Sequence, residues 1–376
     1  MRPAIDERVD RAIAVTGHDD FGDGSWREGL AALLSAAQAT ARLSEGGWSV
    51  IDGYVDHRLE NRLKIVDWAA QHPEVRDDPV SAPVFVVGMS RTGTTFLHNL
   101  LSSDPGARAL LKWEALDSVP PPDGDHLDDD PRVAPSVAST EAMYEAVPEL
   151  RAMHYEAGDG PTECGILLGQ DFRCVDVAGM AFIPDYTAWL FADDTRSAYR
   201  FHRLALQVLG SAAPGRWTLK APYHLMALDA LLDEYPDASV VVTHRDPTEA
   251  VASTGKLVTL GSAALGEVDR HAMARLWFEL LAEMTDRLLD VDARRGDRIL
   301  HVRYPDLVAD PIGTVDAIYA HTGRPMTEQA EAALASYRDD NPQGKHGRVE
   351  YSLDEFGLTA GEVDERFSDY RSRFDV

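Results

Sequence analysis

Residues 83–101 read PVFVVGMSRTGTTFLHNLL, and this stretch decides the fold. Val84 to Val87 form an apolar run that predicts a buried parallel strand, and the apolar residues from Phe96 onward recur at helical spacing. Between these two segments, Gly88 and Gly93 punctuate a turn that directs backbone N–H groups and the positive end of the helix at one spot. The sequence therefore predicts a strand, a loop and a helix that together bind a phosphate or sulfate group.

The loop differs from the one that binds nucleoside triphosphates. Its spacing, GxxxxG, copies the first half of the pattern GxxxxGK[ST], but Thr94 stands where that pattern needs lysine. Arg91 supplies a cation inside the loop instead. The loop therefore fits an anionic nucleotide other than ATP with magnesium, while an ordinary strand–turn–helix with convenient glycines is the alternative. The candidate nucleotide contacts in this segment are Ser90, Arg91, Thr92, Gly93, Thr94 and Thr95.

Bulk properties narrow the class of partner. The chain has 376 residues, 44% of them hydrophobic, which suits one α/β domain with insertions. Its formal net charge of −27 argues against nucleic acid, an anionic membrane or a polyanionic acceptor. Cys164 and Cys174 have neither CxxC spacing nor a nearby histidine pattern, so they are expected to be structural thiols in a reducing compartment. With neither a signal peptide nor an apolar membrane span in the sequence, we expect a cytoplasmic protein.

Strand and helix patterns alternate along most of the chain. Residues 1–80 are predicted to form an N-terminal helical cap, with apolar faces at 26–43 and 57–71. Further strands are predicted at 217–219, 239–243 and 298–302, and helices at 225–232, 247–258 and 272–290. Residues 81–376 are therefore expected to be an α/β domain with a P-loop-like, mostly parallel central sheet flanked by helices. Within it, 117–215 is predicted to be a mainly helical insertion on the acceptor side, and its start at 117–163 is acidic and proline-containing.

Two more polar positions follow predicted strands directly. Lys220 comes after the strand at 217–219, and Arg245 comes after the strand at 239–243. Open α/β sheets bind ligands at the carboxyl ends of their strands. Pro247 fits the first turn of a helix, and Ser253 then lies nearly two turns in, where its hydroxyl could join Arg245 on one phosphate.

In this order, the motifs resemble those of sulfotransferases that use 3′-phosphoadenosine 5′-phosphosulfate (PAPS), in particular the bacterial branch. The loop at 88–95 is similar to their 5′-phosphosulfate loop, and Arg245 with Ser253 is similar to their 3′-phosphate site. Residues 304–311 resemble the Tyr-x-Asp-Leu-x-x-Asp-Pro run that follows their late strand. Residues 341–347 resemble the basic loop that closes over the nucleotide, which implies contacts from Lys345, His346 and Gly347. The resemblance covers about residues 83–376.

The resemblance implies transfer of a sulfuryl group from PAPS to an acceptor hydroxyl, without a metal. Arg91 and Lys220 would act on the transferring group, and a base would remove the acceptor proton. The animal branch carries its base two residues after the lysine, where this chain has Pro222. The carbohydrate and bacterial branches instead use a glutamate 20–30 residues after the loop, which corresponds to Glu114. The other candidate bases are His154, His224 and Glu163.

The acceptor and the rival functions follow from less specific signals. Dense aromatic residues at 144–201 favour a small, apolar hydroxyl compound, although core packing explains most of them, and a sugar stays possible because 117–163 is rich in carboxylates. A P-loop kinase or NTPase would need the missing GK[ST]. A non-catalytic nucleotide-binding scaffold on the same fold is the remaining alternative.

Overall fold

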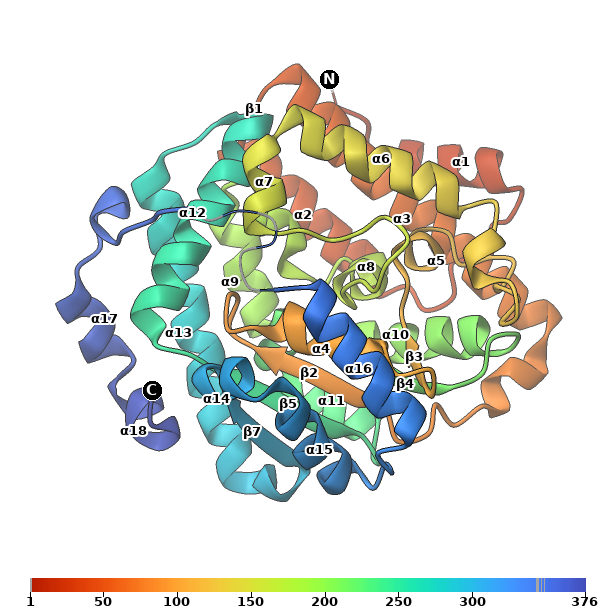
Figure 1. The fold of residues 1–376 in the computed structure, drawn as a ribbon. Coiled ribbons are helices and arrows are strands. Elements are labelled where there is room, and N and C mark those ends of the chain that lie inside the picture. The colour runs from red at the N-terminus through yellow and green to blue at the C-terminus, as the bar shows by residue number, and fades with distance from the viewer. Residues whose placement is uncertain (1, 343–344, 346, 348) are drawn as a thin grey trace.

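The centre of the molecule is a five-stranded sheet in which every strand pair is parallel. The computed structural model describes residues 2–342, 345, 347 and 349–376 (Figure 1). The strand order is β3-β4-β2-β5-β7. This arrangement confirms the predicted parallel α/β fold. The strands are β2 (Val84–Gly88), β3 (Ala107–Ala109), β4 (Arg216–Lys220), β5 (Ser239–His244) and β7 (Ile299–Arg303).

Helices cover both faces of this sheet because its inner strands are apolar on both sides. Val84, Val86 and Val241 face one cluster, whose other buried members are Val302 of β7 and residues from four helices on that side. Phe85 and Val242 face the larger cluster. The first face is covered by α4 (Thr94–Ser102), α14 (Tyr304–Ala309), α15 (Pro311–Thr322) and α16 (Glu328–Asp340). The second is covered by α10 (Arg196–Gly210), α11 (Leu228–Glu234) and α13 (Arg270–Arg295).

The N-terminal helices share the larger hydrophobic cluster with the sheet. They are α1 (Ile5–Thr16), α2 (Trp26–Thr40) and α3 (Glu45–Gln71). Helix α3 begins twelve residues before the predicted 57, because the Ser44 hydroxyl caps it by accepting a hydrogen bond from Gly47 N at 3.0 Å. Gly47 also allows a close approach, since a Cβ there would overlap the carbonyl oxygen of Leu265. Buried Arg62 on α3 pairs with Asp171 at 3.1 Å and so joins these helices to the insertion.

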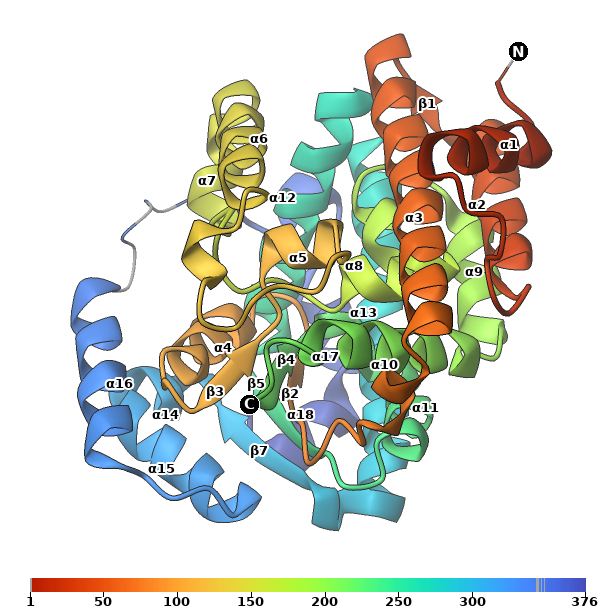
Figure 2. The same ribbon diagram turned by 90° about the vertical axis from the view of Figure 1, so that its right-hand side faces the viewer.

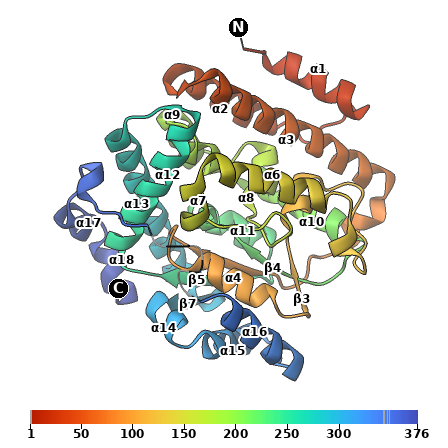
Figure 3. The ribbon, with the colours of Figure 1, turned by 45° about the horizontal axis from the view of Figure 1, so that its top comes forward.

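The segment that joins β3 to β4 is largely helical and contains the predicted insertion at 117–215. Its helices are α5 (Lys112–Leu116), α6 (Val133–Ala146), α7 (Pro148–Met153), α8 (Gly165–Leu168), α9 (Pro184–Ala192) and α10. Figure 2 separates α6 and α7 from the N-terminal helices, with α12 (Pro247–Leu265) between them. Figure 3 shows α7 beside α12, on the side of the sheet where α4 begins. In the described part of the chain, no helix combines the length and the apolar character that a bilayer crossing requires.

Several shorter elements lie outside the sequence predictions. The edge strand β3 is short, and β1 (Arg42–Leu43) pairs with β6 (Gly266–Glu267) in a separate two-stranded sheet. The chain ends in two short helices, α17 (Ala360–Arg366) and α18 (Ser368–Phe374). Figure 1 shows both of them on the side of α13.

Candidate active site

The loop between β2 and α4 has the backbone that the glycine spacing predicts. Gly93 precedes the first residue of α4 and has a φ of 93°, in the left-handed region that favours glycine. A Cβ at this position would also lie 2.8 Å from the ring of Tyr304. Arg91 has a φ of 73°, which is uncommon for a residue with a side chain. The loop therefore turns sharply and leaves the N-terminal N–H groups of α4 available to an anion.

Thr92 differs from its neighbours in this loop because its side chain is fully buried. Its hydroxyl donates to the carbonyl oxygen of Met89 at 2.7 Å and lies 2.7 Å from the hydroxyl of Thr243 at the end of β5. These contacts tie the loop to the neighbouring strand. The Thr92 side chain therefore shapes the loop, and a ligand would meet its backbone.

Three of the predicted nucleotide contacts meet beside the end of β5. Arg245 Nη1 donates to the carbonyl oxygen of Arg91 at 3.0 Å, and Arg91 Nε donates to the buried hydroxyl of Ser253 at 3.1 Å. The Arg245 guanidinium also lies 4.5 Å from the centre of the Tyr304 ring. Burial lowers the pKa of Arg91, and the charge of Arg245 adds to that effect. Two cations at such close range favour an anion between them.

Arg245 already has one anionic neighbour. Its Nη2 atom forms an ion pair with Glu249, one turn into α12. The Arg245 side chain is 20% exposed and that of Glu249 is 54% exposed, so solvent reaches this pair. A ligand phosphate would compete with the glutamate for the same guanidinium.

A second polar group lies at the end of β4, beside the start of α4. Lys220 is 2% exposed, and its Nζ atom donates to Glu163 Oε1 at 2.6 Å. Thr95 Oγ1 lies 3.4 Å from the same nitrogen. The backbone N–H of Cys164 donates to the carbonyl oxygen of Lys220 at 2.8 Å, so the two segments are joined twice. This arrangement brings a cation, a carboxylate and a hydroxyl to the N-terminus of α4.

Glu114 has the contacts of a structural carboxylate. It is fully buried, and Arg108 donates to its two oxygens at 2.8 and 2.5 Å. The backbone N–H of Leu111 donates to Oε1 at 2.8 Å, which fixes the start of α5. The Arg108 guanidinium in turn lies 4.6 Å from the centre of the Trp217 ring. Both oxygens of Glu114 are therefore engaged inside the protein.

The two candidate histidines lie in different environments. His224 is fully buried, contacts the hydroxyl of Tyr199 at 2.8 Å and packs edge-on against Phe85, on the α10 side of the sheet. Burial lowers its pKa well below the usual value. His154 is partly exposed and follows α7, and its pKa is lowered by burial. The charges of Lys220 and Arg91 also lower the pKa of His154, because His154 lies near both cationic groups.

The late basic loop is described only in part, because His346 lies outside the described residues. Lys345 is exposed, and its Nζ atom donates to Asn341 Oδ1 at 3.0 Å. A Cβ on Gly347 would lie 3.5 Å from Ala152 of α7. Further along, the hydroxyl of Tyr351 acts on the pKa of Arg91.

Tyr304 is a site residue to which the sequence analysis gave no role. Its ring contacts Gly93 on one side and Arg245 on the other. The signal was present, since Tyr304 directly follows β7 at the same edge of the sheet as Lys220 and Arg245.

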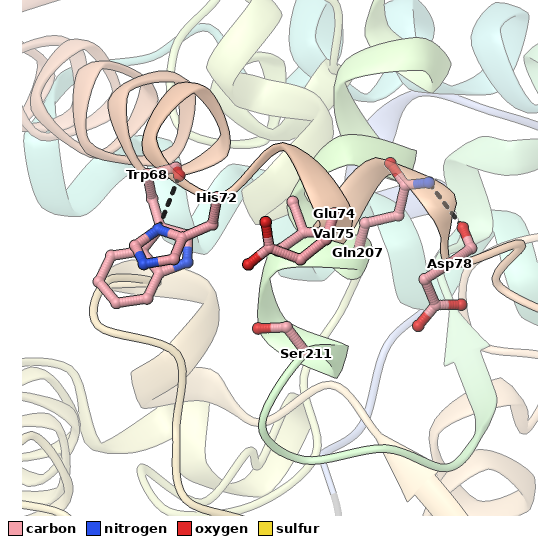
Figure 4. A pocket seen from close by; sticks show the side chains of 7 residues that line it. All are labelled: Trp68, His72, Glu74, Val75, Asp78, Gln207 and Ser211. Carbon is pink, nitrogen blue, oxygen red and sulfur yellow. Dashed lines mark hydrogen bonds between the residues drawn. The ribbon is translucent and has the colours of Figure 1, made fainter.

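A separate cavity of about 310 Å³ lies where α3 ends and α10 approaches it (Figure 4). The rings of Trp68 and His72 stack at one end of it, with centres 4.2 Å apart. None of the predicted site residues lines this cavity. Its lining consists of Trp68, His72, Glu74, Val75, Asp78, Gln207 and Ser211.

Comparisons with known proteins show the family of this chain. A family model described as the sulfotransferase family matches residues 83–328. The crystal structure of sulfotransferase STF1 from Mycobacterium tuberculosis is 33% identical, covers 98% of this chain and 99% of that chain, and has a TM-score of 0.87. That of STF9 from Mycobacterium avium is 32% identical, covers 99% and 97%, and has a TM-score of 0.92. Omega-hydroxy-beta-dihydromenaquinone-9 sulfotransferase Stf3 from Mycobacterium bovis is 24% identical over 311 residues, which are 78% of this chain and 74% of that protein. The matched region includes the loop between β2 and α4 and both polar strand ends, and the chain belongs to the sulfotransferase family.

Proposed function

We propose that this chain transfers a sulfuryl group from PAPS to a hydroxyl of a small, mainly apolar acceptor and releases adenosine 3′,5′-bisphosphate. The observation that carries this proposal is the presence of two cationic groups around one loop. Arg91 and Arg245 lie on the β5 side, and Lys220 lies on the β4 side. PAPS carries two separate anionic groups, a 3′-phosphate and a 5′-phosphosulfate. Its binding site therefore needs two cationic groups.

The 5′-phosphosulfate is assigned to the loop and the start of α4. Backbone N–H groups from Ser90 to Thr95 and the helix terminus would meet the anion, and the Thr95 hydroxyl and Lys220 would complete its shell. The 3′-phosphate is assigned to Arg245 and Ser253. Arg91 belongs to the loop by its backbone and contacts Ser253 by its side chain, so it would bind both groups. Lys345, His346 and Gly347 are assigned to the loop that closes over the nucleotide.

The reaction then needs a base for the acceptor proton. The acceptor oxygen attacks sulfur, the bond from sulfur to the bridging 5′-phosphate oxygen breaks, and the nucleotide leaves with that electron pair. Lys220 and Arg91 would stabilise the charge that grows on the leaving oxygen. The acceptor proton passes to the base in the same step.

We propose Glu163 for this role. Its carboxylate is 16% exposed, lies 2.6 Å from Lys220 Nζ and so stands next to the proposed path of the sulfuryl group. When the donor draws Lys220 away, Glu163 is left as an unpaired carboxylate that can accept a proton. His154 is the alternative, because its lowered pKa keeps the imidazole neutral at pH 7. Glu114 would first have to break its ion pair with Arg108, and its role as the base stays a prediction from the sequence.

The acceptor class rests on weaker support. The named activity of Stf3 is on an omega-hydroxylated menaquinone, which is a long apolar alcohol. Many of the aromatic side chains at 144–201 are buried in the core, including Tyr144, Phe172, Tyr186 and Tyr199. An apolar alcohol remains the acceptor class that we propose for this chain.

Two measurements test the proposal together. Calorimetry should give tight binding of adenosine 3′,5′-bisphosphate that is the same with excess EDTA and with magnesium. A screen of alcohols, phenols and sugars with PAPS, analysed by mass, should then show one added SO₃ on an apolar alcohol. Absence of measurable binding of adenosine 3′,5′-bisphosphate would contradict a PAPS-dependent activity. A sugar as the sole substrate would overturn the acceptor class alone.

A further inference from the structure

The last helix of the chain contacts the strand end that carries Arg245. Tyr370 lies on α18, 126 residues after His244, yet its hydroxyl is 2.9 Å from His244 Nδ1. Burial raises the pKa of Tyr370, and the nearby backbone N–H of Arg245 offsets part of that effect. Tyr370 therefore contacts the last residue of β5, directly before Arg245.

The next residue of α18 holds the turn that follows. Arg371 Nη2 donates to Asp246 Oδ1 at 2.7 Å and to the hydroxyl of Thr248 at 2.8 Å. Asp246 itself caps α12, because Oδ1 also accepts a hydrogen bond from the backbone N–H of Thr248 at 2.8 Å. Tyr370 and Arg371 together engage both chain neighbours of Arg245, which are His244 and Asp246.

A chain of hydrogen bonds gives the Tyr370 contact one direction. His301 lies 3.0 Å from Asp292 Oδ1 through Nε2, and 2.8 Å from His244 Nε2 through Nδ1. The carboxylate can only accept, so His301 Nε2 carries its proton and Nδ1 accepts from His244 Nε2. His244 Nδ1 then accepts from the Tyr370 hydroxyl. Both imidazoles are neutral in this arrangement, and burial agrees with it by lowering the pKa of His244 to about 3.

We propose that Tyr370 and Arg371 are positioning residues for the 3′-phosphate, which they affect through Arg245. This inference rests on the proposed function. A guanidinium binds phosphate strongly only when its donors meet the oxygens at the correct distance and angle. Because α18 holds the residues on both sides of Arg245, it fixes the backbone position from which the Arg245 side chain extends. The preference for a nucleotide with a 3′-phosphate should therefore depend on α18, whereas affinity for the rest of the nucleotide should not.

The test compares two ligands on the full-length protein. Calorimetry gives the dissociation constants of adenosine 3′,5′-bisphosphate and adenosine 5′-monophosphate, and their ratio measures the 3′-phosphate preference. Arg245→Ala should abolish most of this preference. Tyr370→Phe removes one hydroxyl, Arg371→Gln keeps a side chain of similar length, and each should lower the preference about three- to tenfold. Combining Tyr370→Phe with Arg245→Ala should lower it no further than Arg245→Ala alone.

The matched control is Arg366→Gln. Arg366 anchors α17 to Asp286 of α13 through two hydrogen bonds, at 3.1 and 2.6 Å, and contacts nothing at the end of β5. The 3′-phosphate preference of the Arg366→Gln variant should equal that of the unchanged protein. If the unchanged protein shows no preference, or Arg245→Ala leaves it intact, the proposed 3′-phosphate site fails and the inference fails with it. Two outcomes would overturn the positioning role alone, provided that Arg245→Ala abolishes the preference. In one, Tyr370→Phe and Arg371→Gln retain the preference; in the other, they weaken the binding of both nucleotides equally.

Discussion

Strands β4 and β5 each end in a cation that is paired with a glutamate, but the two pairs differ in burial. Lys220 and Glu163 are 2% and 16% exposed, whereas Arg245 and Glu249 are 20% and 54% exposed. An ion pair in contact with solvent contributes only about 0.2–1 kcal/mol, so a phosphate can displace Glu249 readily. A buried pair is costly to separate, because each partner is left without compensation. The β5 end is therefore suited to holding a ligand, and the β4 end to a charge that changes during reaction.

The largest effect on turnover is expected when the ion pair at the β4 end is removed. Glu163→Gln keeps a hydrogen-bonding partner for Lys220 but cannot accept a proton, so turnover should fall about 100- to 10,000-fold. Binding of adenosine 3′,5′-bisphosphate should persist. Single-turnover measurements with PAPS and a saturating acceptor would show the loss in the chemical step.

Glu156→Gln is the matched control for that variant. Glu156 is a nearby carboxylate, but it pairs with Lys112 at 3.3 Å and accepts a hydrogen bond from Thr162 at 2.8 Å. Its replacement should leave the chemical step much less affected. Near-normal single-turnover rates in Glu163→Gln would instead transfer the base role to His154.

Glu114 sharpens the comparison because it is buried, as the Lys220 pair is, yet it has both oxygens engaged. Glu114→Gln leaves the buried charge of Arg108 without its counterion, so the free energy of unfolding should fall by about 3 kcal/mol. Chemical denaturation followed by fluorescence measures this change. A stable Glu114→Gln protein whose turnover has collapsed would show that Glu114 is the base after all.

Acidification tests a feature that both strand ends share. His98 contacts the carbonyl oxygen of Thr218 in β4 at 3.1 Å, and His244 ends β5. Burial lowers the pKa of each to about 3, with the charge of Lys220 adding to the effect at His98 and that of Arg373 at His244. These folded-state values lie below the unfolded value of 6.5, so their stabilising effect is complete above pH 6.5. It is lost as the pH falls from there toward 3.

Each such histidine should cost about 1.4 kcal/mol of unfolding free energy per pH unit below 6.5. Asp176 acts in the opposite direction, because burial raises its pKa to about 6. Denaturation midpoints at pH 7.5, 6.5 and 5.5 check the net sign. A midpoint that stays constant or rises between pH 6.5 and 5.5 would contradict the neutral-histidine assignment.

The smallest effect is expected at the exposed pair. Glu249→Gln removes the competitor for Arg245, so affinity for adenosine 3′,5′-bisphosphate should rise by about 0.2–1 kcal/mol, or up to about fivefold. The gain should shrink at high salt, because an exposed pair is screened. Calorimetry at two ionic strengths measures both quantities. A weaker affinity in Glu249→Gln would show that Glu249 orients Arg245 instead of competing for it.

The sheet was predictable because its inner strands are continuous apolar runs. Val84 to Val87 and the segment 239–243 carry β-branched residues that suit a strand buried on both faces. Ala107–Ala109 gave no such signal, because a three-residue edge strand has no pattern to detect. The first half of α3 was missed for a related reason, since Gly46, Gly47 and Gly53 interrupt its apolar spacing.

The candidate site divides in the same way. Lys220, Arg245 and Ser253 were identified from their distance to strand ends, and that distance depends on local sequence alone. The ranking of the bases depended on contacts between distant residues. Nothing local in Trp113-Glu114 shows that Arg108 engages both oxygens, or that Glu163 lies beside Lys220 from 57 residues away. Position along the chain indicated which strand ends carry cations, but not which glutamate lies beside Lys220.

The double connection between 163–164 and Lys220 has a consequence for how substrates enter and products leave. The side chains of Glu163 and Lys220 form one connection, and the backbone bond from Cys164 to Lys220 forms the other, 2.8 Å long. The backbone connection does not depend on the charge of either side chain, so it keeps Glu163 beside the end of β4 when the donor draws the Lys220 ammonium away. An opening motion that lets the nucleotide out is therefore expected to bend the chain outside 163–164 and the end of β4.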